Sequence, residues 1–382
     1  MSKQIINFIR EKFNTKDFIP LHSPVFIGKE KEYLMKCIDS TFVSSVGKYV
    51  DEFESLMSLS TKTKRAIAVV NGTAGLHVAL KLVGVKKGDE VITQALTFVA
   101  TANAIAYNNA LPVFLDVDID TMGLSPKAVE NFLIEFGELR KDGCYNKKTG
   151  RKIGACMPMH TFGFPVDLDE LIRVCKEWNI PLVEDAAESL GSKYKGKSTG
   201  SFGNVGVFSF NGNKIITSGG GGAIVTNNIE LGNRAKFLTT TAKEPHAYEY
   251  VHNELGYNYR MPNLNAALAC AQMEKLNYFI EEKRKLAKDY QSFFKEKGIN
   301  FRTENPNTKA NYWLMCIELE NKRERDIFLK ETNNQGVMTR PIWRLINSLP
   351  MYSECYRDSQ ENAKYLVDRI VNVPSSVNTC IG

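Results

Sequence analysis

Short apolar runs alternate with amphipathic stretches over the first two thirds of the chain. Seven of these runs have the length that is typical of buried strands. Most of the seven are also rich in β-branched or aromatic residues, as buried strands usually are. They lie at residues 66–70, 90–94, 111–117, 154–159, 180–186, 205–210 and 222–227. Alternation of strand and helix predicts an α/β fold with a largely parallel sheet.

The stretches between these runs carry helix-start signals. One helix is predicted after Ser125, which can serve as N-cap with Pro126 in the first turn, and another after the N-cap Asp167. Residues 139–153 are polar and rich in turn-forming residues, so we expect a surface hairpin or loop there.

The pattern changes beyond residue 260. Residues 263–297 have the pattern of one long helix, with a small apolar first half and a highly charged second half, which is typical of a helix that bridges two domains. A strand at 311–320, a helix at 322–336 and a closing helix near 361–370 follow. We therefore expect two domains, at residues 1–260 and 261–382.

The composition is that of an ordinary globular protein. Of 382 residues, 43% are hydrophobic and 24% charged, and no apolar run is long enough to span a bilayer. The first residues lack the apolar core and cleavage site of a signal peptide, so we expect a cytoplasmic protein without membrane contact. The eight cysteines include no CxxC pair, so we expect reduced thiols rather than disulfides or a metal site.

The net charge of +6 is spread along the chain. The densest basic group, Lys193, Lys195 and Lys197, favours the rim of an exposed hairpin; binding of a substrate phosphate is the alternative. No basic face with interleaved aromatic residues is visible, so nucleic acid is not an expected partner.

Lys214 and Asp185 supply the candidate chemistry. Lys214 stands shortly before four consecutive glycines, 219–222, and Asp185 follows Glu184 at the end of an apolar strand. A pyridoxal 5′-phosphate (PLP) enzyme needs a lysine amine to hold the cofactor and a carboxylate to keep its pyridine nitrogen protonated. The sequence therefore predicts Lys214 and Asp185 as the catalytic pair of such an enzyme.

Two glycine-containing segments lie near this pair. Gly72, Thr73 and Ala74 form a strand-to-helix turn, where free amides and the positive helix end favour an anion; a plain connection is the alternative. The run 219–222 lacks the P-loop pattern, and its glycines fit a close backbone approach beside a bulky cofactor.

Several motifs together resemble the DegT/DnrJ/EryC1/StrS family of sugar-nucleotide aminotransferases. In chain order they are NGTAGLHVAL, GDEVITQALTFVATANAI, PVFLDVD, VEDAAESLGSKYKGKSTGSFG, FSFNGNKIITSGGGGAIVTN and ELGYNYRMPNLNAALA. The resemblance covers about residues 18–376. It implies PLP fold-type I, the scaffold of aspartate aminotransferase, with a mainly parallel seven-stranded sheet in a large domain and a smaller C-terminal α+β domain.

The resemblance also implies roles for individual residues. It places Phe98 against the cofactor ring and Asp185 at the pyridine nitrogen. The phosphate would be held by Gly72, Thr73, Ala74, Ser209 and the Asn258 of a neighbouring subunit. A residue supplied by the neighbour implies a homodimer with shared active sites.

Two positions depart from the family pattern. The family usually has Gln or His where this chain has Glu188, near the cofactor's 3-hydroxyl, so Glu188 would have to share a proton or adjust its pKa. Many members carry His in place of Asn211. With His22 and His160, Asn211 is a candidate substrate residue; for His160 a structural role is the alternative.

The implied reaction moves the amino group of L-glutamate to a nucleotide-linked 4-keto-6-deoxy sugar, with pyridoxamine phosphate as the amino-carrying form of the cofactor. Residues 19–54, the FSFNGNK motif and Glu188 look most like the subgroup that makes UDP-N-acetylbacillosamine and legionaminic-acid precursors. That subgroup implies UDP-2-acetamido-2,6-dideoxy-4-keto-hexose as acceptor. GDP-perosamine synthases are the alternative; a PLP-dependent sugar 3-dehydratase is disfavoured because it would replace Lys214 with His.

Overall fold

The structure is a computed structural model that describes residues 2–378. The seven predicted strands are all present in this part of the chain, each within or beginning one residue before its apolar run. They are β1 (Arg65–Val69), β2 (Glu90–Gln94), β3 (Leu111–Leu115), β6 (Ile153–Cys156), β7 (Val183–Asp185), β10 (Val205–Ser209) and β11 (Gly222–Thr226).

These strands lie side by side in one surface. Hydrogen bonding gives the orders β1-β11-β10-β7 and β3-β2-β6, and parallel bridges from Cys156 to Leu182 and from Met159 to Asp185 join the two groups. Only β11 runs antiparallel to its neighbours, while the pairs β10/β7, β2/β3 and β2/β6 are parallel. The prediction of an α/β fold with a mainly parallel sheet is confirmed.

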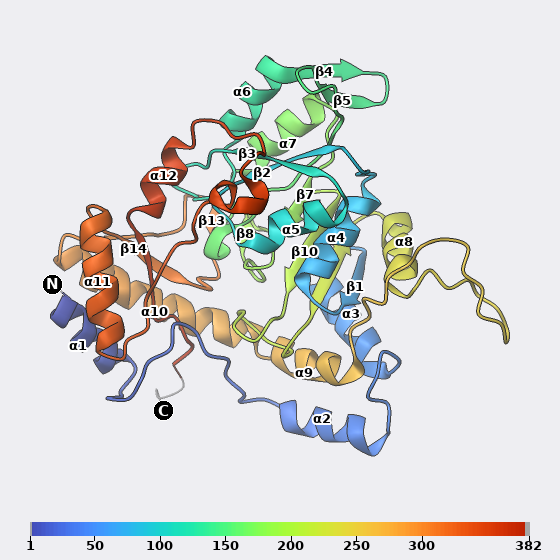
Figure 1. Ribbon diagram of the computed structural model, residues 1–382. Helices are drawn as coiled ribbons and strands as arrows, with labels where there is room; N and C mark the ends of the chain where they lie inside the picture. The colour runs from blue at the N-terminus through green and yellow to red at the C-terminus, as the bar shows by residue number, and fades with distance from the viewer. Residues whose placement is uncertain (1, 379–382) are drawn as a thin grey trace.

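Helices flank this sheet (Figure 1). They are α3 (Lys48–Thr61), α4 (Gly72–Leu82), α5 (Val99–Tyr107), α6 (Pro126–Phe136), α7 (Leu168–Glu177) and α8 (Ile229–Thr239). Ser125 and Asp167 cap α6 and α7 through their side-chain oxygens, as predicted. Residues of α4 pack with Ile67, Val207 and Ile224 of the sheet in one apolar core.

The last glycine of the run 219–222 stands where the backbone is crowded. Gly222 begins β11 opposite Val69, and a Cβ atom at this position would lie 2.7 Å from the carbonyl carbon of Asn71. A side chain here would collide with the turn between β1 and α4. The glycine therefore lets β11 pass close to the start of α4.

Two hairpins extend from the large unit. Strands β4 (Gly137–Arg140) and β5 (Gly143–Asn146) form the expected hairpin. Strands β8 (Lys193–Tyr194) and β9 (Lys197–Ser198) form the second, which β13 (Thr308–Lys309) extends. The three lysines are exposed, Lys195 pairs with Asp169, and Lys197 lies over the Phe202 ring, as expected for a hairpin rim.

The prediction of one long helix over residues 263–297 is wrong. The chain forms α9 (Asn263–Met273) and α10 (Leu276–Glu296), which are separated at Glu274 and Lys275. Helix α9 packs on α2 (Glu30–Asp39) and α3, and the Gln272 amide near its end donates to Glu30 at 2.6 Å. The aromatic residues of α10 pack instead with the C-terminal unit. The helix is interrupted because its two halves pack against different layers.

The C-terminal unit is a four-stranded antiparallel sheet with helices. Its elements are β12 (Asn300–Phe301), β14 (Met315–Glu318), β15 (Arg340–Pro341), β16 (Ile370–Val373), α11 (Lys322–Asn334) and α12 (Glu361–Val367). Single 3-10 turns lie at η1 (Thr161–Gly163) in the large unit and at η2 (Ile346–Ser348) and η3 (Pro350–Tyr352) here. The short strands β12, β15 and β16 were not predicted from the sequence.

The N-terminal helix α1 (Ser2–Lys12) packs with this C-terminal unit. It contacts α11, beside which it lies in Figure 1, and Phe8 stacks on Phe293 of α10 with ring centroids 4.0 Å apart. We had assigned these first residues to the large domain. The domain boundary near residue 260 stays a prediction. The contacts of α1 indicate that this helix packs with the smaller, C-terminal domain.

The structure of residues 2–378 bears on membrane spans, on the state of the cysteines and on metal sites. No helix in this range is long and apolar enough to cross a membrane. The cysteines in this range are free thiols, whereas Cys380 lies outside it. In the same range, no three His, Cys, Asp or Glu side chains are grouped as a metal site requires.

Candidate active site

A cavity of ≈ 680 Å³ lies at the carboxyl ends of the central strands, under the C-terminal unit. Its lining includes Asp185 at the end of β7, Ser209 at the end of β10 and Lys214 in the following loop. The C-terminal unit contributes Trp313 and the segment 340–344. Open α/β sheets bind ligands at this edge of the sheet.

Lys214 points into this cavity from the loop after β10. Its Nζ atom lies 3.3 Å from Glu188 Oε1 and 3.9 Å from the centroid of the Trp313 ring. The indole nitrogen of Trp313 in turn donates to the Asn213 carbonyl oxygen at 2.6 Å. The amine is therefore held between one carboxylate and one aromatic face.

Asp185 is the buried carboxylate of the cavity. It accepts hydrogen bonds from the Thr101 hydroxyl at 2.8 Å and from the Ala187 amide at 3.2 Å. Burial raises the pKa of Asp185, while these two hydrogen bonds and the charge of Lys214 act in the opposite direction. A carboxylate in this environment is suited to a cationic partner that enters the cavity.

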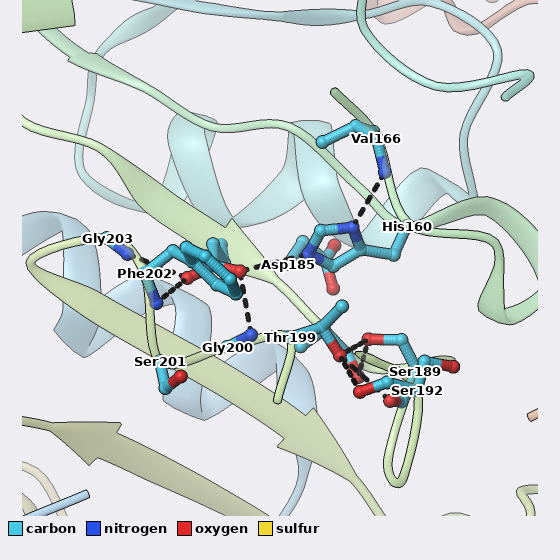
Figure 2. Close-up of polar contacts among 12 residues, drawn as sticks. His160, Val166, Asp185, Ser189, Ser192, Thr199, Gly200, Ser201, Phe202 and Gly203 are labelled. Carbon is cyan, nitrogen blue, oxygen red and sulfur yellow. Dashed lines mark hydrogen bonds and ion pairs between the residues drawn. The ribbon is translucent and has the colours of Figure 1, made fainter. Parts of the chain in front are cut away.

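Glu184, the neighbour of Asp185, has a structural place. Its carboxylate accepts from the backbone amides of Gly200, Phe202 and Gly203, each at 2.7 Å. These three residues are labelled in Figure 2. The fourth contact of Glu184, at 3.1 Å, is to His160 Nε2. Glu184 therefore fixes the loop that precedes β10 to the end of β7.

His160 is fully buried and satisfied by these surroundings. Its Nδ1 accepts from the Val166 amide at 3.3 Å, so its Nε2 carries the proton that it donates to Glu184 (Figure 2). The structure does not place His160 in the cavity lining. The sequence predicts His160 as a substrate residue, and its contacts agree instead with the structural alternative.

One end of the cavity is formed by the turn between β1 and α4. Gly72 and Thr73 line it beside Ser209, and a Cβ atom at position 72 would lie only 3.0 Å from the Ser209 Cβ. The Ala74 amide is already bound to the Asn71 side chain at 2.8 Å. Gly72, Thr73 and Ser209 thus stand close together in a turn that is suited to an anion, whereas Ala74 lies outside the cavity lining.

The other predicted contacts are divided between the cavity and its surroundings. Phe98, which precedes α5, lines the cavity and is 52% exposed, so its ring is available to a ligand. Asn211 also lines the cavity. His22 lies outside the lining with both ring nitrogens buried. Burial, helped by the charge of Lys283, holds the pKa of His22 well below its usual range.

Asn258 does not line the cavity of its own chain. Its side-chain oxygen accepts from Arg260 Nε at 2.9 Å, and its backbone bridges to Thr240. It belongs to the segment between α8 and α9, which projects from the body of the molecule (Figure 1). Arg260 bridges to Val69 of β1, so the backbone at this position anchors the segment to the sheet.

Sequence reasoning missed much of the cavity wall. Phe162 has a left-handed backbone (φ 55°), which is unusual for a bulky residue, and its ring packs against Trp343 with centroids 4.9 Å apart. Trp313, Arg340 and Arg344 come from the C-terminal unit. Only the VMTRPIW stretch, which combines one arginine with several large apolar residues, could have drawn attention to this wall.

Comparison with known proteins identifies the family. The model of the DegT/DnrJ/EryC1/StrS aminotransferase family matches residues 26–380. The chain belongs to this family. Its members are PLP-dependent sugar aminotransferases, so the predicted enzyme class and cofactor are confirmed.

Relatives in this family align over most of their length. A GDP-perosamine synthase of Escherichia coli O157:H7 is 37% identical over 94% of this chain and 93% of its own. A GDP-perosamine synthase of Vibrio cholerae is 35% identical over 95% of each chain. The crystal structure of the aminotransferase TlmJ from Streptoalloteichus hindustanus superposes with a TM-score of 0.84 at 24% identity, over 94% of this chain and 93% of that one, and confirms the fold.

The residues of this aminotransferase fit PLP. The cavity has the volume of a small-molecule site, about 300–1,000 Å³. It combines one amine, a buried carboxylate and a turn suited to an anion in one space. PLP, when bound, supplies a carbonyl that reacts with amines and a ring that accepts electrons.

Proposed function

We propose that this aminotransferase moves the amino group of L-glutamate to C4 of a GDP-linked 4-keto-6-deoxy sugar. The observation that supports GDP is the similarity to two GDP-perosamine synthases, at 37% and 35% identity over more than nine tenths of the chain. The sequence had favoured a UDP-linked acceptor, with the GDP-linked sugar as the alternative. The comparisons favour that alternative.

In the proposed reaction Lys214 and Asp185 have separate tasks. The Lys214 amine would hold the cofactor and, when free, would move the proton at the donor's Cα. Asp185 keeps the proton on the pyridine nitrogen, since it is buried and its oxygens are fixed by Thr101 and Ala187. Gly72, Thr73 and Ser209 bind the phosphate, and Phe98 covers the ring.

Arg340 and Arg344 form a cationic rim on the same cavity. Within residues 2–378, neither guanidinium group has an ion pair or a hydrogen bond. Guanidinium groups bind diphosphate in bidentate fashion, and free ones at a cavity rim are suited to an anionic substrate. We assign this rim to the diphosphate of the nucleotide sugar.

Replacing both arginines with alanine is expected to raise the KM for the nucleotide sugar about 10²- to 10⁴-fold, because each charged hydrogen bond contributes about 1.5–3 kcal/mol and the two together about 3–6 kcal/mol. Steady-state kinetics with the sugar and L-glutamate varied in turn measures this effect. Arg323→Ala, an exposed arginine of α11, is the matched control. An unchanged KM for the sugar in the double variant would show that Arg340 and Arg344 do not bind the substrate.

The nucleotide itself is tested by direct competition. GDP- and UDP-linked 4-keto-6-deoxy sugars are offered with L-glutamate, and the amino sugar and 2-oxoglutarate are quantified by mass spectrometry. We expect the GDP-linked sugar to be the better substrate. Exclusive turnover of UDP-2-acetamido-2,6-dideoxy-4-keto-hexose would instead support the candidate favoured by residues 19–54 and Glu188.

We also propose a homodimer in which Asn258 completes the partner's phosphate site. The projecting segment carries uncovered apolar side chains, with Tyr248 83% and Leu255 73% exposed, as expected for a surface that another subunit covers. Asn258 stands outside its own cavity, which fits donation to a second copy.

Mixing two inactive variants tests this sharing. Mixed dimers of Lys214→Ala and Asn258→Ala contain one site with both residues intact, so random exchange is expected to restore about a quarter of the wild-type sites. Lys214→Ala mixed with Asp185→Asn is the control, because these two residues lie in one cavity and no intact site can form. Activity no higher than this control, in dimers shown to be mixed, would place Asn258 outside the partner's site.

A further inference from the structure

Glu188 is a second buried carboxylate in the cavity, and only 3% of its surface is exposed. One oxygen accepts from the Phe162 amide at 2.9 Å, and the other lies 3.3 Å from Lys214 Nζ. Its backbone oxygen is held separately by the Asn311 amide at 2.9 Å. The side chain is therefore fixed by a backbone amide on one oxygen, and its other oxygen faces the amine.

Both neighbours of the Glu188 carboxylate are hydrogen-bond donors. A protonated carboxyl group would have to donate its proton, whereas an ionised one accepts only. A backbone amide and an ammonium group therefore suit the ionised form. Burial raises the pKa of Glu188, while the charge of Lys214 and the Phe162 amide oppose this effect.

Other charged groups surround Glu188 and Lys214. Among the described residues, none of these groups forms an ion pair with the Lys214 Nζ atom. Asp185 is occupied by Thr101 and Ala187. The remaining groups are His160 before η1, His22 in the N-terminal segment, and Arg340 and Arg344 at the rim. Glu188 is the carboxylate in direct contact with Lys214 Nζ.

We propose that Glu188 is the ionised counter-charge of the Lys214 nitrogen and keeps a proton on this nitrogen when the cofactor is attached to it. The inference rests on the proposed role of Lys214. The two buried carboxylates then have different tasks: Asp185 stabilises a proton on the ring nitrogen, and Glu188 stabilises a proton on the lysine nitrogen. Glu188 is then a positioning and charge-setting residue that a neutral glutamine cannot replace.

The test is a pH titration of the visible absorption band of the holoenzyme, in which the cofactor reports protonation of the lysine nitrogen. A carboxylate in contact with a cation shifts a titration by about 1–3 units. Glu188→Gln is therefore expected to lower the midpoint by about 1–2 pH units, because the protonated form loses its counter-charge. Glutamine keeps the size of the side chain and an oxygen for the Phe162 amide.

Two further variants separate charge from structure. Glu188→Asp keeps the charge and should leave the midpoint closer to wild type than Glu188→Gln does. Glu188→His removes the negative charge with a residue type found in the family and should lower the midpoint as well. An unchanged midpoint in the neutral variants, with the band retained, would show that Glu188 is neutral or only structural.

This outcome is distinct from a failure of the proposed function. If borohydride fixed the cofactor to a residue other than Lys214 in the wild-type protein, the role of Lys214 would be wrong. If it fixed the cofactor to Lys214 and the neutral variants titrated like the wild type, only the inference about Glu188 would be overturned.

Discussion

Replacing Lys214 with alanine is expected to lower the rate of transamination by at least about 10⁴-fold, since the amine is both the attachment point and the proton carrier. Among the described residues of the cavity, Lys214 is the only primary amine. The rim arginines cannot substitute, because a guanidinium group stays protonated. The rate of 2-oxoglutarate formation from L-glutamate measures the loss, and borohydride should no longer fix the cofactor to the protein.

Lys214→Arg is the matched variant for this experiment. Arginine keeps a positive charge beside Glu188 and the Trp313 ring, so the cavity is preserved while the reactive amine is lost. Both variants should be equally inactive. Activity within about 100-fold of wild type in either one would contradict the assigned chemistry.

Asp185→Asn is expected to lower kcat by about 10²–10⁴-fold while the cofactor stays bound. Asparagine keeps the shape of the side chain and an oxygen for the Ala187 amide, but it cannot hold a proton on the pyridine nitrogen by charge. Kinetics must be paired with the stoichiometry of the cofactor, released by denaturation and measured by absorbance. A variant with full occupancy and wild-type kcat would show that the ring needs no carboxylate here.

The sheet was predictable because each of its strands is buried and therefore apolar along its length. The helix at 263–297 was not, since the helical spacing continues through Glu274 and Lys275 and only the packing of α9 and α10 on different layers interrupts it. The short strands β12, β15 and β16 escaped for a related reason. The two residues of β12 and of β15 are too few to show a period, and β16 begins at residue 370, to which the closing helix was expected to continue.

Only the wall of the cavity that the large unit forms was predictable from the sequence. Asp185 and Ser209 end strands of the large unit, and Gly72 and Lys214 stand shortly after strands. Motifs mark them because strand ends fix their positions. Trp313, Arg340 and Arg344 lie on the opposite wall, in a unit whose placement over the sheet depends on tertiary contacts. Local sequence contains no signal for which of its side chains face the cavity.

The adjacent carboxylates of β7 also constrain the length of the chain. Successive residues of a strand face opposite sides, and pairing with β10 aligns Glu184 with Gly206 and Asp185 with Val207. A slip of one residue would turn Glu184 toward the cavity and Asp185 toward the loop amides. An insertion or deletion between α7 and β7 that shifts this register would therefore disrupt the cavity even if every residue that lines it were still present.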